Sequence, residues 1–430
     1  MKPVSRSGLL ASGMLLLAAA SPALGQANEP ILSLARKEQP ALLETLKGLV
    51  SIESGSRDVE GLGKLAELIA ARLKELGGDV ALVEPGDVYR MEDTPETIGK
   101  MVRATFAGTG SKKILLLAHM DTVYPRGMLA KQPFRVDGNR AYGLGIADDK
   151  QGIAVILHTI AMLKALDFRG FGTLTVLINA DEELSSPGSR SLITKLGAEH
   201  DAVFSLEGSR AESDKVALAT SGIASITLTV QGKASHAGVR PEAGVNALYE
   251  LAHQVLQTRD LSDPASGLKM NWTMANAGRT RNMIPPNAQA IADIRVLRVS
   301  DYDGIEKKVR ELIKNQLLPE AKVEMIFERR RPPLEATEAS RALAAHAGKV
   351  YRELGRELVV DVVAEGGGTD AAFAALDAKG PVIERLGLQG FGAHSIEAEY
   401  VLVDSIAPRL YLLTRMIMDV AQGKTTSASR

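Results

Sequence analysis

The sequence contains no cysteine. This absence excludes a disulfide scaffold, a cysteine-ligated zinc site, an iron–sulfur cluster and a cysteine nucleophile. An excess of one charge is also lacking, since the formal net charge is −1 and no long block of like charges occurs. We therefore expect neither a disordered chain nor a nucleic-acid partner. A chain of 430 residues can bury a full core without a metal. Any metal would therefore serve chemistry rather than folding.

Long hydrophobic runs are absent except at the N-terminus. There Lys2 and Arg6 precede the apolar stretch GLLASGMLLLAAASPAL, and Ala23-Leu24-Gly25 has the small residues of a cleavage site. This pattern predicts a secretory signal peptide over residues 1–25 and, in a Gram-negative cell, a periplasmic protein. A buried N-terminal helix is the alternative interpretation. No later run approaches the roughly 20 apolar residues that span a membrane, so we expect no membrane partner.

Short apolar runs alternate with helical segments in the first half of the chain. Residues 113–118, 173–179 and 202–206 have the apolar runs of buried strands, and residues 150–166 the pattern of a helix. Strands that alternate with helices predict an α/β fold with a mostly parallel, doubly wound sheet. In such sheets ligands bind beyond the carboxyl ends of the strands.

The pattern changes after about residue 221. Alternating strands and amphipathic helices follow in the order β-α-β-β-α-β, which is typical of a small α+β, ferredoxin-like domain. Helical patterns over 339–354 and 404–420 then suggest that the first domain resumes. We predict a catalytic domain formed by residues 26–220 and 332–430, with residues 221–331 inserted as a smaller domain.

Charged residues follow the predicted buried strands where each strand ends. Taken singly, each has an ordinary explanation, such as a helix cap, a solvated turn or a satisfied polar group. Together, several carboxylates at one sheet edge would repel one another unless a cation neutralised them. Histidine and carboxylate ligands without cysteine favour zinc, and the number of acids suggests two ions. The residues at the strand ends are His119, Asp121, Glu182, Glu183 and Glu207, and Asp148 lies between the first two clusters, just before a predicted helix.

Two histidines lie in glycine-rich contexts, where loops display binding residues: His236 in GKASHAG and His394 in GFGAHSIEAEY. His158, by contrast, lies in an apolar helical pattern and is expected to be a core histidine. An ordinary loop histidine is the alternative for His236.

Several motifs, in order, resemble those of the di-zinc aminoacylase/carboxypeptidase family. They are LLLAHMDTV, YGLGIADDKQG, NADEELSSPGS, FSLEG, GKASHAG, RNMIP and GFGAHSIEAEY. Within that family, residues 30–421 most resemble the bacterial folate-hydrolysing glutamate carboxypeptidases of the carboxypeptidase G type. The resemblance implies two zinc ions per subunit, bridged by Asp148. His119 and Glu207 would complete one site, and Glu183 and His394 the other.

The resemblance also implies roles around the two ions. Glu182 would be the general base, and Asp121 would fix the tautomer of His119. His236 would reach across the interface of a homodimer into the partner's site, which makes the inserted segment a dimerisation domain. The resemblance further implies a cis peptide between Asp148 and Asp149.

Substrate residues follow from the need to hold a free C-terminal carboxylate, which arginine binds bidentately. Asn282 and Arg295 match a substrate-binding pair of the resembled family. Lys215 and Arg331 match positions available for a glutamate side chain, and Gly367 lies in a glycine-rich segment that can form an anion nest. Surface salt bridges and turns are the alternative explanations.

The sequence therefore predicts a secreted zinc exopeptidase that releases a C-terminal amino acid, expected to be glutamate, from folates or from N-acyl or peptidyl glutamates. Within the same family, an N-acyl-amino-acid amidohydrolase or dipeptidase is the alternative. A periplasmic solute-binding protein is the alternative from another class, although such a protein would not place five carboxylates on one strand edge. A degenerate family member that acts as a binding scaffold would not retain all the ligand positions.

Overall fold

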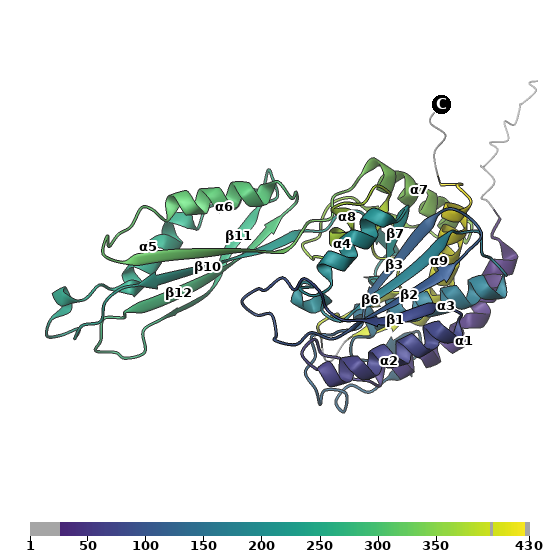
Figure 1. Cartoon of the computed structure of the whole chain (residues 1–430), viewed down its shortest axis with the longest axis horizontal. Helices are drawn as coiled ribbons and strands as arrows, with labels where there is room; N and C mark the ends of the chain where they lie inside the picture. The colour runs from purple at the N-terminus through teal and green to yellow at the C-terminus, as the bar shows by residue number, and fades with distance from the viewer. Residues whose placement is uncertain (1–25, 396–398, 426–430) are drawn as a thin grey trace, which may run out of the picture.

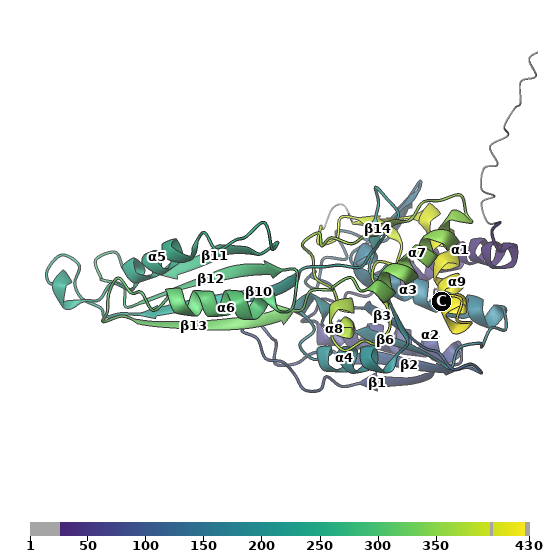
Figure 2. The ribbon, with the colours of Figure 1, turned by 90° about the horizontal axis from the view of Figure 1, so that it is seen from above.

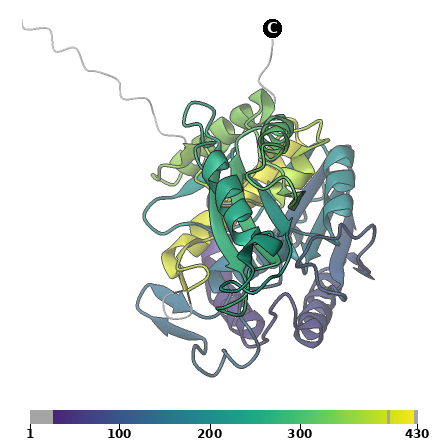
Figure 3. The same ribbon diagram turned by 90° about the vertical axis from the view of Figure 1, so that its left-hand side faces the viewer.

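The computed structural model describes residues 26–395 and 399–425, so the predicted signal peptide lies outside the described residues. Figure 1 shows a larger α/β body from which a small sheet with two helices extends. Figure 2 shows the same two parts from above, and Figure 3 views them along the long axis with the small sheet in front. Among the described helices, none has the length and apolar character needed to cross a membrane.

The larger body is built on a six-stranded sheet in the order β1-β2-β6-β3-β7-β15. The four strands from β6 to β15 are parallel, as predicted, whereas β1 and β2 run antiparallel to their neighbours. The sheet is therefore mixed, and the sequence prediction missed its two antiparallel strands. The strand bounds are Asp79–Val83 (β1), Met101–Ala107 (β2), Thr173–Asn179 (β6), Lys113–His119 (β3), Ala202–Ser205 (β7) and Val382–Ile383 (β15).

Helices cover both faces of this sheet because successive residues of its central strands point to opposite sides. In β3, Ile114 and Leu116 pack into one core, and Leu115 and Leu117 into the other. The doubly wound arrangement that the sequence predicts is therefore confirmed. The first core is covered by α1 (Glu29–Val50), α2 (Val59–Glu75), α3 (Gln151–Ala165), α7 (Glu338–Arg352) and α9 (Ile406–Ala421), and the second by α4 (Arg190–Glu199) and α8 (Ala371–Ala375).

The small sheet has the order β11-β12-β10-β13 with all neighbours antiparallel. Its inward residues, such as Ile226 and Leu228 of β10, pack against both helices on one face. This is the β-α-β-β-α-β arrangement that the sequence predicts. The elements are β10 (Gly222–Gln231), α5 (Ala247–Thr258), β11 (Lys269–Ala277), β12 (Asn287–Val296), α6 (Asp301–Leu312) and β13 (Lys322–Arg331).

Short strands that the sequence analysis did not resolve form two further sheets. One has the order β4-β5-β17-β16-β8, and the other pairs β14 with β9. Their strands flank the segments that carry His394 and Lys215, so these sheets help to shape the site described below. The bounds are Arg135–Asp137 (β4), Arg140–Tyr142 (β5), Tyr400–Leu402 (β17), Gln389–Phe391 (β16), Ser209–Arg210 (β8), Val359–Asp361 (β14) and Lys215–Ala217 (β9).

Short helical turns complete the described chain: η1 (Ile146–Lys150), η2 (Glu182–Leu184), η3 (Pro241–Ala243) and η4 (Val403–Ser405). The first two matter for function, because η1 follows Gly145 and carries Asp148, and η2 carries Glu182 and Glu183 shortly after the end of β6. Gly145 has φ 68°, a conformation that favours glycine.

Candidate metal centre and active site

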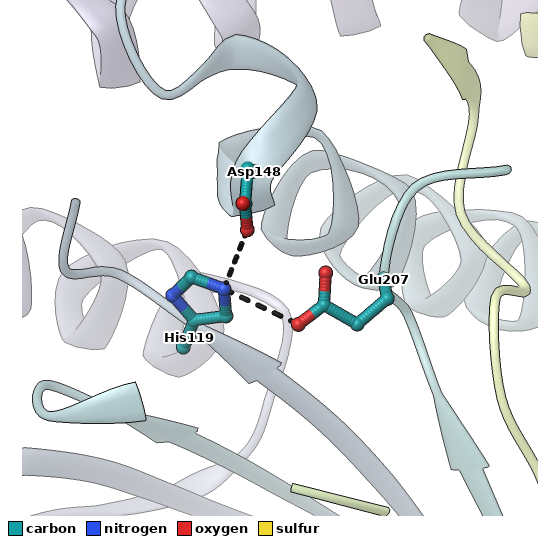
Figure 4. A group of neighbouring side chains, drawn as sticks. All are labelled: His119, Asp148 and Glu207. Carbon is teal, nitrogen blue, oxygen red and sulfur yellow. Dashed lines mark hydrogen bonds and ion pairs between the residues drawn. The ribbon is translucent and has the colours of Figure 1, made fainter. Parts of the chain in front are cut away.

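The carboxyl ends of β3 and β7 and the turn η1 bring three candidate ligands together, as Figure 4 shows. Nε2 of His119 lies 3.0 Å from Oδ1 of Asp148 and 3.3 Å from Oε1 of Glu207. The three ligand atoms lie within 4.8 Å of one another. His119 itself is buried, with only 1% of its surface exposed. This geometry can hold one cation.

A second group of three shares Asp148 with the first. Nε2 of His394 lies 3.2 Å from Oδ2 of Asp148 and 3.2 Å from Oε2 of Glu183. Asp148 therefore directs one carboxylate oxygen toward each group, as a bridging ligand would. The structure brings together all five residues for which the sequence resemblance implies metal binding.

The donor set fits divalent cations by its chemistry. Oε1 of Glu183 is buried and has no hydrogen-bond partner among the described residues. Burial raises the pKa of Glu183 to about 8, and hydrogen bonds that His394 donates to the carboxylates of Asp148 and Glu183 raise the pKa of His394 to about 11. The site thus favours extra positive charge, held as protons on its carboxyl and imidazole groups. Two divalent cations would supply that charge directly.

Asp121 lies behind the first group and is fully buried. Nδ1 of His119 lies 3.1 Å from the backbone oxygen of Asp121 and 3.3 Å from its Oδ1. The same carboxylate accepts hydrogen bonds from the backbone N–H groups of Glu182 and Glu183, at 3.0 and 3.1 Å. Asp121 therefore orients both the His119 ring and the turn that carries the two glutamates, which extends the role that the resemblance implies.

Glu399 holds the backbone around Asp148, a role that the sequence analysis missed. Its carboxylate accepts hydrogen bonds from the backbone N–H groups of Gly145, Ala147 and Asp148, at 2.9, 2.8 and 3.2 Å. The Tyr124 hydroxyl donates a further bond at 2.6 Å. The motif that contains His394 also contains Glu399 and could have pointed to it. The Asp148–Asp149 peptide is cis, so that prediction is confirmed.

The candidate base Glu182 is buried and paired with Arg331. Arg331 donates from Nη1 to the Glu182 carboxylate and from Nη2 to its backbone carbonyl. The same Nη1 of Arg331 also lies 3.5 Å from Oδ1 of Asp370. Burial raises the pKa of Glu182 to about 7, although the charge of Arg331 opposes the shift.

A cavity of about 510 Å³ opens beside both candidate metal groups. Three residues that the sequence predicts to bind substrate line it: Arg295, Arg331 and Gly367. Arg295 donates from Nη1 to the backbone oxygen of Gly366 at 3.0 Å, which ties it to the glycine-rich segment. Two further cations, Arg210 and Arg385, line the same cavity. No local motif marks either of them, and the sequence analysis missed both.

Three other predicted residues do not line this cavity. Nζ of Lys215 instead lies 3.1 Å from Asp361 and 2.9 Å from Glu365. His236 and Asn282 lie on neighbouring exposed loops of the small sheet, where the backbone oxygen of Asn282 accepts a bond from Ala237. Within this chain, the structure therefore separates Asn282 from Arg295.

The exposed ring of His236 has a defined orientation. Its Nδ1 accepts hydrogen bonds from the backbone N–H groups of Gly238 and Val239, at 3.2 and 3.1 Å. The neutral ring therefore carries its proton on Nε2, which remains available as a donor.

A second cavity, of about 610 Å³, is also lined by Glu183. Its lining includes the apolar or aromatic side chains of Val123, Tyr124, Pro125 and Leu184. Glu183 therefore borders both a cavity rich in arginine and a cavity with an apolar wall.

Comparison with known proteins places the chain in a family. Residues 115–419 match peptidase family M20/M25/M40. The chain belongs to this family and is an enzyme of the metallo-carboxypeptidase class. It is 45% identical over 425 residues to carboxypeptidase G2 from Pseudomonas sp. (strain RS-16), an alignment that covers 99% of this chain and 100% of that protein.

Solved structures show the same fold at low sequence identity. A tripeptidase from Staphylococcus aureus superposes with a TM-score of 0.74 at 20% identity, covering 89% of this chain and 99% of that one. A dinuclear metal-binding peptidase of the M20 family from Bacillus subtilis superposes with a TM-score of 0.64 at 15% identity, covering 90% and 99%.

Proposed function

We propose that this protein is a secreted, zinc-dependent carboxypeptidase that hydrolyses the amide bond of acylated or peptidyl glutamates and releases glutamate. One observation carries the proposal: two candidate metal groups share Asp148 beside a cavity lined by four arginines. Such a cavity suits an anionic leaving group. Similarity to carboxypeptidase G2 supports the same reaction type.

His119, Asp148 and Glu207 would hold one zinc ion, and Asp148, Glu183 and His394 the other. When bound, two such ions activate a water molecule and polarise the scissile carbonyl group. Asp121 keeps the His119 ring in the orientation that leaves Nε2 for the metal, because Asp121 occupies the Nδ1 side.

Glu182 would act as the general base. Its carboxyl group, with a pKa raised to about 7 by burial, can take a proton from the attacking water and later give it to the leaving amine. Arg331 keeps Glu182 in place through the two hydrogen bonds described above. We retain Arg331 also as a candidate contact for the substrate carboxylate, since it lines the cavity.

Arg295 and the segment around Gly367 would receive the α-carboxylate of the leaving amino acid. Both line the arginine-rich cavity, and Arg295 is held by the backbone of the neighbouring Gly366. The second cavity would receive the acyl group on its apolar wall. Lys215 remains a prediction from the sequence alone.

We further propose a homodimer in which His236 and Asn282 complete the partner's site. Both residues are exposed on loops of the small sheet and do not line the cavity of their own chain. Nε2–H of His236 would donate to the negative oxygen that develops during hydrolysis. In this proposal residues 221–331 are the dimerisation domain, residues 26–220 and 332–430 the catalytic domain, and residues 1–25 the signal peptide.

The proposal is tested with purified protein stripped of metal by a chelator and then supplied with zinc. We expect glutamate release from folate and N-benzoylglutamate to disappear with the chelator and return with about two zinc ions per chain. Faster hydrolysis of dipeptides, or of N-acyl amino acids other than glutamate, would instead favour the amidohydrolase or dipeptidase alternative. Tight ligand binding without hydrolysis by the zinc-loaded protein would favour a solute-binding protein.

A further inference from the structure

Two arginines that line the arginine-rich cavity and are distant in sequence converge on one carboxylate oxygen of Glu365. Nη2 of Arg210 lies 3.1 Å from Oε2 of Glu365, and Nη1 of Arg385 lies 3.0 Å from the same oxygen. Lys215 holds the other oxygen of Glu365 at 2.9 Å. Like charges this close repel one another, so a fold that brings them together creates a place for anions.

Glu365 does not exhaust this positive charge. With Asp361 beside Lys215, the cluster has three cations and two carboxylates, so one positive charge remains. Each guanidinium group donates to Glu365 from one nitrogen only, Nη2 in Arg210 and Nη1 in Arg385. Across residues 26–395 and 399–425, the remaining N–H groups of Arg210 and Arg385 donate no other hydrogen bond. They are available for a second carboxylate.

The backbone of Arg385 is also unusual. Its φ is 66°, in the left-handed region that non-glycine residues rarely adopt, and its carbonyl oxygen accepts a bond from Arg409 at 3.0 Å. Such conformations persist where the surroundings fix them, and they cluster at ligand sites. Of the six described non-glycine residues with positive φ, Ser185, Arg385 and His394 all line this cavity.

Besides Arg331, the cavity has two cationic groups: the pair Arg210 and Arg385, and the single residue Arg295. Both groups are tied to neighbouring residues of one loop. Arg210 and Arg385 bond to Glu365, and Arg295 bonds to the backbone of Gly366. Arg210, Arg295 and Arg385 also line the same cavity. A ligand with two carboxylates a few bonds apart, such as an acidic amino acid, can reach both groups, whereas an amino acid with a neutral side chain uses only one.

We propose that Arg210 and Arg385 bind the side-chain carboxylate of the leaving amino acid and so make the enzyme select an acidic residue. This inference rests on the proposed function and deepens it. From the sequence, Lys215 was expected to bind the glutamate side chain. The inference gives that role to the two arginines, while Lys215 keeps Glu365 in place.

The test compares two substrates of equal shape, N-benzoylglutamate and N-benzoylglutamine, in the zinc-loaded enzyme. The variants are Arg210→Gln, Arg385→Gln and the double variant, with the exposed Arg341→Gln on α7 as the matched control. We expect kcat/KM for the glutamate substrate to fall about 10- to 100-fold in the double variant, the loss typical of charge-assisted hydrogen bonds. The glutamine substrate and the control should change little.

A double variant that keeps the wild-type preference for glutamate would overturn the inference and leave the proposed function standing. An equal loss on both substrates would also overturn it, because the arginines would then support catalysis rather than selection. If Lys215→Gln loses the preference for glutamate while the double variant keeps it, then Lys215 rather than the arginines binds the side-chain carboxylate.

Binding of free glutamate and glutamine, measured by calorimetry, separates this inference from the proposed function. A wild-type protein that hydrolyses neither substrate would overturn the proposed function. In that case, the binding data would still test the subsite. If the wild type prefers glutamate over glutamine and the double variant does not, the subsite is supported. If the wild type shows no such preference, the inference is overturned.

Discussion

Arg331 holds Glu182 at two points, with one guanidinium nitrogen on the carboxylate and another on the backbone carbonyl. The two residues are 149 positions apart in sequence, and Arg331 is the last residue of β13. The candidate base is therefore positioned from the small sheet. Any movement of that sheet relative to the larger body would change the hydrogen bonds between Arg331 and Glu182.

Replacing Glu182 by glutamine is expected to keep both metals and lower turnover by about 10²-fold or more, since only the proton acceptor is lost. The amide oxygen can still accept a hydrogen bond from Arg331, so the local structure should persist. Metal analysis and kcat are measured on the same sample. Near-normal turnover in a metal-replete Glu182→Gln variant would assign the base to another residue.

Asp148→Ala is expected to reduce the binding of both zinc ions, because one carboxylate faces both candidate groups. The measurement is the zinc content after dialysis against a weak chelator. Asp137→Ala, at an exposed position of β4, is the control and should retain wild-type metal content. Two zinc ions bound per chain in Asp148→Ala would contradict the bridging role.

Two inactive variants are expected to complement each other if His236 acts in the partner's site. His236→Ala mixed with Glu182→Gln in equal amounts should give about half heterodimers, each with one intact site, and about a quarter of wild-type activity. Activity is assayed after subunit exchange has been demonstrated with labelled chains. Exchange without any return of activity would mean that His236 acts in its own subunit or not at all.

Stability is expected to fall as the solution is acidified below pH 6.5, in part through His158. Burial lowers the pKa of this histidine in the fold, although Glu38 lies 2.7 Å from Nδ1 and opposes the shift. In the unfolded chain the His158 ring has a pKa of about 6.5, so it binds a proton at a higher pH than the ring in the folded protein does. The free energy of unfolding therefore declines as the pH falls from about 6.5 toward the lower pKa of the folded state.

The free energy of unfolding, measured by urea titration at several pH values, should decline less steeply in His158→Gln than in the wild type. Arg341→Gln, at an exposed position of α7, is the control and should keep the wild-type slope. Equal slopes in His158→Gln and the wild type would show that this histidine does not contribute.

The sequence predicted the ligand cluster because its logic is local. Apolar runs identify strands, strand ends lie at one sheet edge, and His119 and Glu207 follow directly from that rule. His158 is likewise a buried histidine of α3, as its apolar context indicated. The small sheet was predictable for the same reason, since buried residues largely alternate with more exposed ones along β10 and β12.

Contacts between distant segments could not be predicted in this way. Nothing near Arg210 or Arg385 indicates that they meet at Glu365. Arg210 ends the short strand β8 and Arg385 follows the short strand β15, and neither strand is long enough to show a periodic pattern. Strand β1 was missed since it is mostly exposed, and an exposed edge strand lacks the apolar run that marks its buried neighbours. Lys215 was matched by position alone, and its partners are set by the pairing of β9 with β14.

The small sheet begins and ends at neighbouring strands, with Ile223 of β10 paired directly to Arg331 of β13. A short linker could therefore join residue 221 to residue 332 without stretching the rest of the chain. Such a shortened protein would keep every candidate metal ligand but lose Arg295 and Arg331. The topology thus makes the small sheet separable from the metal ligands but not from the base: exchanging it between relatives would keep every candidate metal ligand and would alter the contact that positions Glu182.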